Sequence, residues 1–300
     1  MNYAVEPDGR VNSLPLNLDP WVVYYNKELF DARGIAFPKT FAEMQDTAAK
    51  LTDSGKGVAG FVARGLKNAN VPVWTSFLLG YGGSFIDGKG KLLTDSSEAI
   101  DAGKMYQVML GKYGPPGVAG FNWNESQSLF LQGKAAMWLD GIGFAQPLED
   151  PTKSRIVGKV GYGVMPAGPK RQVSALFGDG EGISTYSKKK GPAWFYLQWA
   201  SNKMNQTRML QAAAGAPVRN SAYAAAQSSS DFKAPKQWVE CMLTSARIAQ
   251  PGLPVISPVT EFRDVFGVAL TNMINGADPA AELKKATADF QPVLDKSEKA

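Results

Sequence analysis

The sequence predicts an α/β fold in which two lobes are joined by three extended segments. Short apolar, β-branched runs alternate with longer amphipathic stretches along the chain, which is typical of α/β proteins with at least some parallel strand pairing. Three segments rich in glycine or proline, near 14–22, 174–183 and 251–258, interrupt the helical stretches. We interpret them as crossings between two lobes that enclose a cleft. Three ordinary loops would produce the same pattern.

Helices are expected where apolar residues recur at helical spacing after a capping residue. Thr40 and Glu43 have the spacing of a capping box, and a second helical stretch ends at the glycines of 80–83. We expect helices at 38–52, 71–79, 94–111, 125–132, 191–213, within 231–247, and at 262–275 and 280–294. We expect strands or extended segments at 11–25, 57–62, 135–139, 161–165, 175–184 and 251–258, and turns at 113–116 and 215–223.

The composition excludes several classes of enzyme. The chain has 300 residues, 44% of them hydrophobic, and no apolar run long enough to span a membrane. It has no histidine and one cysteine, so the usual serine, cysteine and metal hydrolases lack their central residue. Cys241 lies among apolar residues, which favours inert packing. We therefore expect no disulfide, no metal and no cofactor.

The charge distribution argues against nucleic-acid binding. The chain has 32 basic and 27 acidic residues, a net charge of +5, and its longest basic run is only Lys188-Lys189-Lys190. Aromatic residues are not interleaved with arginine or lysine as they are in single-strand binders. The first residues also lack the charged start and apolar run of a signal peptide.

Six stretches, in consistent order along nearly the whole chain, resemble a known family. They are Tyr24-Tyr25-Asn26-Lys27-Glu28-Leu29-Phe30 followed by Gly34 and Pro38-Lys39-Thr40-Phe41; Gly82-Gly83 after a helix; Phe130 with Gly133-Lys134-Ala135-Ala136-Met137; Val160-Gly161-Tyr162 with Pro166; 178–184; and Gly276-Ala277-Asp278-Pro279 with Leu283. This order resembles that of carbohydrate-type extracellular solute-binding proteins of ABC importers, the maltose-binding-protein-like family 1.

The resemblance implies a two-lobe periplasmic binding protein fold of type II, with hinge crossings and an interlobe cleft. It assigns 1–17 and 180–252 to lobe one, and 18–179 and 253–300 to lobe two. In the family a substantial part of lobe one precedes the strand that Leu14-Pro15 resembles, so we expect lobe one to lack its opening strand–helix units. The resemblance also implies a monomer, located in the periplasm or lipid-anchored outside the cell, that delivers its solute to an ABC transporter permease.

Asp19 and Trp21 on the first crossing are the first candidate ligand-binding residues. Asp19 corresponds in position to an acidic cleft residue of the maltose-binding relatives, which implies a role as hydroxyl acceptor; the alternative is a cap for the turn at Pro20. Arg64 follows a predicted strand and Trp74 begins a helix, so they form a plausible donor and stacking pair. A surface arginine and a core tryptophan are the alternative.

Four further candidates combine aromatic rings and carboxylates, which together suit a sugar. Trp123 and Glu125 precede a helix, and Asp140 ends a strand, where ligands of α/β sheets bind. Asp179 lies on the second crossing among glycines that permit close backbone approach, and hinge geometry alone is its alternative.

The sequence thus predicts a solute-binding protein for a neutral sugar or polyol, with no catalytic residue. No phosphate-binding loop is visible, which favours a neutral ligand. One alternative is a carbohydrate-active hydrolase, in which a carboxylate pair such as Asp140 and Asp179 would do the chemistry. Another is a truncated relative that binds nothing, because a cleft without one wall loses contacts.

Overall fold

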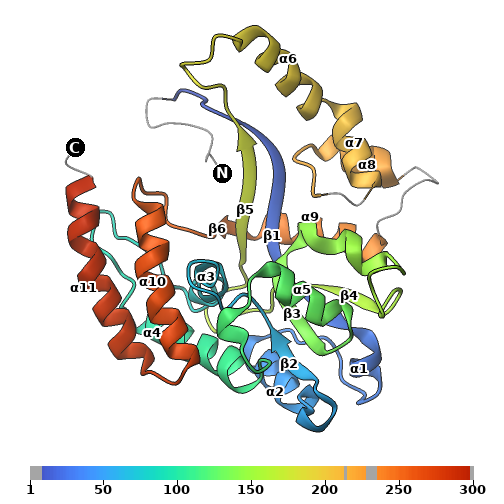
Figure 1. Ribbon diagram of the computed structural model, residues 1–300, viewed down its shortest axis with the longest axis vertical. Coiled ribbons are helices and arrows are strands. Elements are labelled where there is room, and N and C mark those ends of the chain that lie inside the picture. Colours follow the sequence, from blue (N-terminus) through green and yellow to red (C-terminus); the bar gives the residue numbers. More distant parts are fainter. Residues whose placement is uncertain (1–8, 213–214, 228–234, 298–300) are drawn as a thin grey trace.

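The computed structural model describes residues 9–212, 215–227 and 235–297 and has the predicted α/β architecture (Figure 1). Its strands are β1 (Leu14–Asn26), β2 (Ala59–Val62), β3 (Ala135–Gly141), β4 (Val160–Val164), β5 (Ser174–Glu181) and β6 (Ala249–Pro251). Its helices are α1 (Lys27–Asp31), α2 (Phe41–Leu51), α3 (Val71–Gly80), α4 (Ser97–Gln107), α5 (Trp123–Leu131), α6 (Lys190–Ser201), α7 (Lys203–Gln211), α8 (Asn220–Gln227), α9 (Lys236–Arg247), α10 (Val259–Ile274) and α11 (Pro279–Ser297).

The long strand β1 organises the sheet. Its first half pairs with β5 from Leu14 to Pro20, and its second half lies between β3 and β4, all antiparallel. The remaining pairs, β2 with β3 and β5 with β6, are parallel, so the expected parallel pairing is confirmed. One strand therefore runs from the central sheet into the first predicted crossing.

The first two predicted crossings lie side by side, and the third meets them only at its first residue, Pro251. In Figure 1, β1 and β5 extend together from the larger lower body toward the separate group of helices α6, α7 and α8. The third crossing is shorter than expected, because only Ala249–Pro251 pairs as a strand and the chain from 252 to 258 has no regular structure. The lobe boundaries expected from the sequence stay a prediction.

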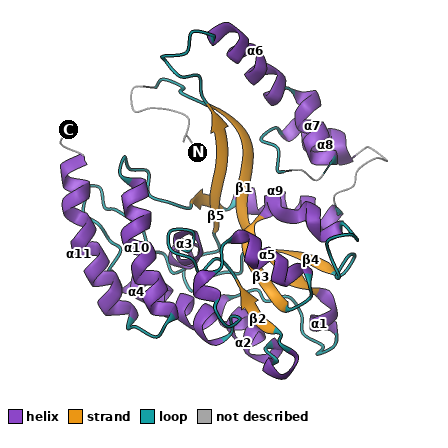
Figure 2. Ribbon diagram, viewed as in Figure 1, coloured by secondary structure: helices purple, strands orange, loops and turns teal. Residues whose placement is uncertain are grey.

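The core lies on both faces of the central sheet, because successive residues of β1 point to opposite sides. Trp21 and Val23 pack with helices α2, α3, α4, α10 and α11, whereas Val22 and Tyr24 pack with helices α5 and α9. Figure 2 shows helices around the strands of this body. The arrangement is the layered packing expected of an α/β chain.

Two helical stretches differ from the sequence prediction. The helix expected at 191–213 breaks at Asn202, whose extended backbone ends α6 and whose side chain accepts the Asn205 N–H to begin α7. The turn expected at 215–223 gives way to helix α8 from Asn220 onward. In the stretch expected at 231–247, α9 begins at Lys236, and residues 231–234 lie outside the described part of the chain.

Candidate functional site

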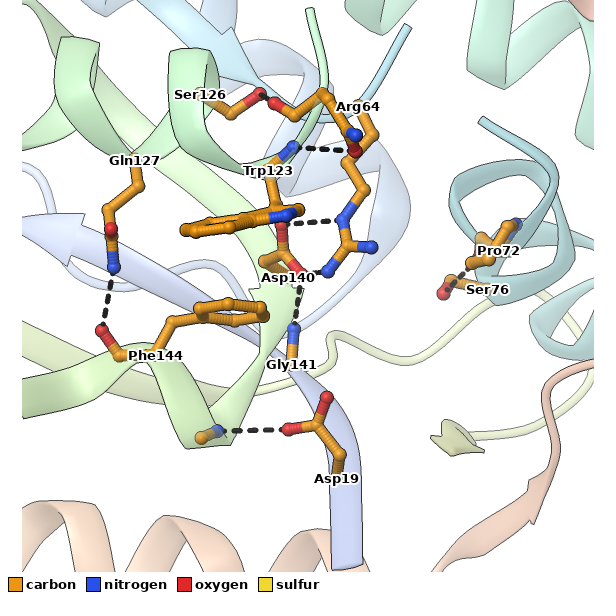
Figure 3. A network of polar contacts seen from close by, with 12 residues as sticks. Asp19, Arg64, Pro72, Ser76, Trp123, Ser126, Gln127, Asp140, Gly141 and Phe144 are labelled. Atoms are coloured by element: carbon orange, nitrogen blue, oxygen red, sulfur yellow. Dashed lines mark hydrogen bonds and ion pairs between the residues drawn. The ribbon is translucent and has the colours of Figure 1, made fainter. Parts of the chain in front are cut away.

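A buried ion pair forms where the parallel strands β2 and β3 end. Arg64 follows β2 and Asp140 lies near the end of β3, and the carboxyl ends of parallel strands meet at one edge. Arg64 Nε donates to Asp140 Oδ2 at 2.9 Å and Nη2 donates to Oδ1 at 2.5 Å (Figure 3). This bidentate contact fixes the orientation of the guanidinium plane. The Asp140 side chain is fully buried, and that of Arg64 is 16% exposed.

Aromatic rings enclose the guanidinium. The Cζ atom of Arg64 lies 5.1 Å from the ring centroid of Trp21 and 5.5 Å from that of Phe144, which are cation–π distances. Burial raises the pKa of Asp140, while the charge and hydrogen bonds of Arg64 lower it. Arg64 Nη1 makes no hydrogen bond to any described residue, so this nitrogen is available to a ligand.

Asp19 reaches the same place from strand β1. Its Oδ1 accepts the Gly143 N–H at 2.9 Å. Burial raises the pKa of Asp19 to about 7; the Gly143 hydrogen bond opposes this rise and the nearby charge of Asp140 adds to it. A Cβ atom on Gly141 would lie 1.9 Å from Asp19 Oδ2, so only glycine permits this approach.

Trp123 provides an exposed aromatic face beside these polar groups. Its ring stacks on that of Phe144 with centroids 5.3 Å apart and planes at 22°, and the residue is 41% exposed (Figure 3). Glu125, which was expected beside it at the site, instead caps helix α5: its Oε2 accepts the Asn122 N–H at 2.8 Å. Glu125 therefore stabilises the start of α5, and we leave it out of the site.

Asp179 lies farther along the β1–β5 ribbon. It pairs with Asn17, whose Nδ2 donates to Asp179 Oδ2 at 3.3 Å, and its side chain is exposed. Residues directly opposite in an antiparallel pair share a face, and Asn17 and Asp19 are two apart, so Asp179 and Asp19 lie on one face. Asp179 therefore lies on the same face of the ribbon as Asp19, at the next residue pair on that face.

Trp74 belongs to the core instead. It is fully buried in helix α3, stacks on Phe266 at 5.9 Å, and donates its indole N–H to the Ala99 carbonyl. A side chain with no exposed surface offers no face to a ligand, so the core alternative describes Trp74 and we leave it out of the site.

The sequence analysis did not single out three residues of the site, namely Gly141, Gly143 and Phe144. Gly141 is the last residue of β3, and Gly143 and Phe144 belong to the short helical stretch η4 (Ile142–Glu149), which is too irregular to show helix periodicity. The available signal was the Gly-Ile-Gly-Phe sequence directly after Asp140, which brings the backbone close to neighbouring groups.

The assembled site therefore offers a half-buried carboxylate on Asp19, a buried carboxylate on Asp140, a guanidinium held by Asp140 and an exposed indole face. Such groups can accept from and donate to hydroxyls while a ring packs against C–H surface. Within 9–212, 215–227 and 235–297, no group of three acidic or cysteine side chains could hold a metal ion. In the same ranges no helix has the length and apolar character needed to cross a bilayer.

Comparison with known proteins gives consistent matches. Residues 2–207 match the bacterial extracellular solute-binding protein family. The mannitol-binding protein of Pseudomonas aeruginosa is 24% identical over 93% of this chain and 69% of its own length. The erythritol/L-threitol-binding protein of Mycolicibacterium smegmatis is 26% identical over 91% of this chain and 58% of its own length.

Solved structures match over almost the whole chain. An ABC transporter solute-binding protein from Agrobacterium radiobacter, in complex with ribitol, has a TM-score of 0.87 and 27% identity, covering 97% of this chain and 74% of that one. A solute-binding protein from Agrobacterium vitis with bound D-mannitol has a TM-score of 0.84 and 23% identity, covering 98% and 74%.

Proposed function

Because the chain belongs to the family of bacterial extracellular solute-binding proteins, we propose that it captures a neutral sugar or polyol at the Asp19–Arg64–Asp140 site. The structural likeness confirms the type II, two-lobe fold expected from the sequence. The names of the relatives specify mannitol, erythritol and ribitol, all of them uncharged. Delivery to an ABC transporter permease, outside the cytoplasm, completes the proposed role.

The observation that carries the proposal is the clamped Arg64 between two aromatic rings. Vicinal hydroxyls present paired donors and acceptors, which suit a planar guanidinium and carboxylate oxygens. Asp140 neutralises Arg64, so a free anion would gain little there. An uncharged, hydroxyl-rich solute suits this balance of charges better than an organic acid does.

The exposed ring of Trp123 supports the same ligand class. A pyranose or an extended polyol has C–H faces between its hydroxyls, and an aromatic ring packs against them. Trp123 stands on the ring of Phe144, which fixes its orientation beside the polar groups. The combination of one aromatic platform and a few convergent polar groups is typical of small-molecule sites.

We propose binding without turnover. A glycosidase needs one carboxylate free to donate a proton and a second free to attack or to activate water. Here both carboxylate oxygens of Asp140 accept from Arg64, so Asp140 is free for neither role. Binding without turnover means that each chain binds one solute and releases the same, unmodified molecule.

A titration of intrinsic tryptophan fluorescence tests the proposal, because the exposed Trp123 ring lies at the site and the buried Trp21 ring packs against Arg64. The panel contains ribitol, D-mannitol, erythritol and maltose. We expect saturable one-to-one binding of at least one of them. Arg64→Lys keeps the charge but loses the bidentate contact, so affinity should fall about tenfold or more. The exposed Arg247→Lys is the matched control. The proposal is contradicted if no member of the panel changes the fluorescence, or if Arg64→Lys and Arg247→Lys bind with equal affinity.

A further inference from the structure

The 141–144 turn, which consists of the last residue of strand β3 and the first three residues of η4, has an unusual set of partners. Its main-chain polar groups are bonded to side chains from three other elements. From β1, the Tyr24 hydroxyl donates to the Gly141 carbonyl at 2.7 Å, and Asp19 accepts from Gly143. Side chains of another element, strand β1, therefore hold the 141–144 turn in place.

Two of these partners lie on helices α9 and α5. The Trp238 indole N–H, on helix α9, donates to the Ile142 carbonyl at 2.9 Å. Gln127 Nε2, on helix α5, donates to the Phe144 carbonyl at 3.0 Å (Figure 3). Trp238 is fully buried and Gln127 is 8% exposed, so water does not replace either bond readily.

The turn needs such restraint because of its sequence. Gly141 and Gly143 give the backbone more freedom than other residues would. Yet the site depends on the positions of two groups in this turn. The Gly143 N–H holds Asp19, and the Phe144 ring supports Trp123 and faces Arg64. Because the glycine backbone is flexible, the positions of these two groups depend on the hydrogen bonds that the turn makes with side chains of other elements.

We propose that Trp238 and Gln127 are positioning residues, which hold the 141–144 turn so that Asp19 and Phe144 stand correctly for the solute. The consequence for solute binding rests on the proposed function; the restraint of the turn does not. Helix α9 thereby acts on the site without touching the solute. Loss of either donor removes a side-chain hydrogen bond that holds the turn and loosens the Gly143 N–H.

Amide hydrogen exchange of the ligand-free protein tests the restraint directly, because local opening of the turn exposes the Gly143 amide. The variants are Trp238→Phe and Gln127→Met, each of which removes a donor and keeps most of the apolar volume. Trp74→Phe is the matched control: Trp74 is equally buried, and its indole N–H also donates to a backbone carbonyl, that of Ala99 at 3.4 Å.

We expect exchange at Gly143 to rise about tenfold in both variants and to stay unchanged in Trp74→Phe. Ribitol affinity, measured by calorimetry, should fall by a similar factor in the first two variants only. If Trp238→Phe does not fold, Gln127→Met alone decides. Unchanged exchange at Gly143 in the folded variants overturns the proposal. A wild-type chain that binds no polyol overturns the proposed function, while the exchange result still decides on the positioning residues.

Discussion

Gly141 lies so close to Asp19 that one methyl group tests the geometry of the site. A Cβ atom built on Gly141 would lie 1.9 Å from Oδ2 of Asp19 and 2.4 Å from both Cγ and Oδ1. The backbone of Gly141, with φ −61° and ψ 145°, suits any residue. The substitution Gly141→Ala therefore introduces a clash without dihedral strain.

The size of the effect follows from these distances. Atoms in ordinary van der Waals contact are about 3.5 Å apart, so the Asp19 carboxyl must retreat by roughly 1.5 Å. Such a shift breaks its 2.9 Å hydrogen bond from the Gly143 N–H. A hydrogen bond to a charged group contributes about 1.5–3 kcal/mol. We expect polyol affinity to fall by about ten- to a hundredfold.

Calorimetric titration with ribitol measures this loss, and urea unfolding measures the accompanying change in stability. Gly88→Ala is the control, because a Cβ atom on Gly88 meets nothing within 4 Å. Adding Asp19→Ala to Gly141→Ala removes the obstructing carboxyl and should restore stability, though not affinity. The reasoning is refuted if Gly141→Ala binds and unfolds like Gly88→Ala.

Three further outcomes are expected. Because burial raises the pKa of Asp19 from 3.8 to about 7, the folded state holds its proton more tightly than the unfolded state, and stability falls as pH rises from about 4 to 7. Urea unfolding of Asp19→Asn should lack this part of the fall; an identical pH profile would contradict it. Trp123→Ala should weaken ribitol binding about tenfold in calorimetry but cost less than about 1.5 kcal/mol of stability, since the ring is partly exposed. Asn202→Ala removes the cap of α7 and should lower the free energy of unfolding by about 1 kcal/mol, and no change in urea midpoint would argue against a capping role.

The sequence predicted the strands and most helices because their signals are local. A short apolar run located β3, capping residues located α2, and glycine correctly indicated the end of α3. The break at Asn202 was missed because an asparagine inside an amphipathic stretch is tolerated, and only its extended backbone ends the helix. Helix boundaries set by one cap are poorly visible in composition.

The site was predictable only in part, for a different reason. Arg64 follows β2 and Asp140 lies near the end of β3, and these strands pair in parallel, so the meeting of the two residues follows from topology once the strands are known. Trp74 and Trp123 look alike in sequence, yet one is fully buried and the other is 41% exposed. Exposure of an aromatic side chain depends on packing across elements far apart in the chain, which a local pattern does not contain.

The central claim, that a neutral polyhydroxylated solute binds between Asp19, Arg64 and Trp123, is tested most directly by a crystal structure of the chain with ribitol. A separate groove, lined by residues that include Leu79, Ile256 and Leu294, is the competing location. We expect ribitol with hydroxyls on the Asp19 carboxyl and the Arg64 guanidinium, and its carbon chain against the Trp123 ring. Ribitol seated in the groove, with Asp19 and Arg64 free of it, would contradict the account.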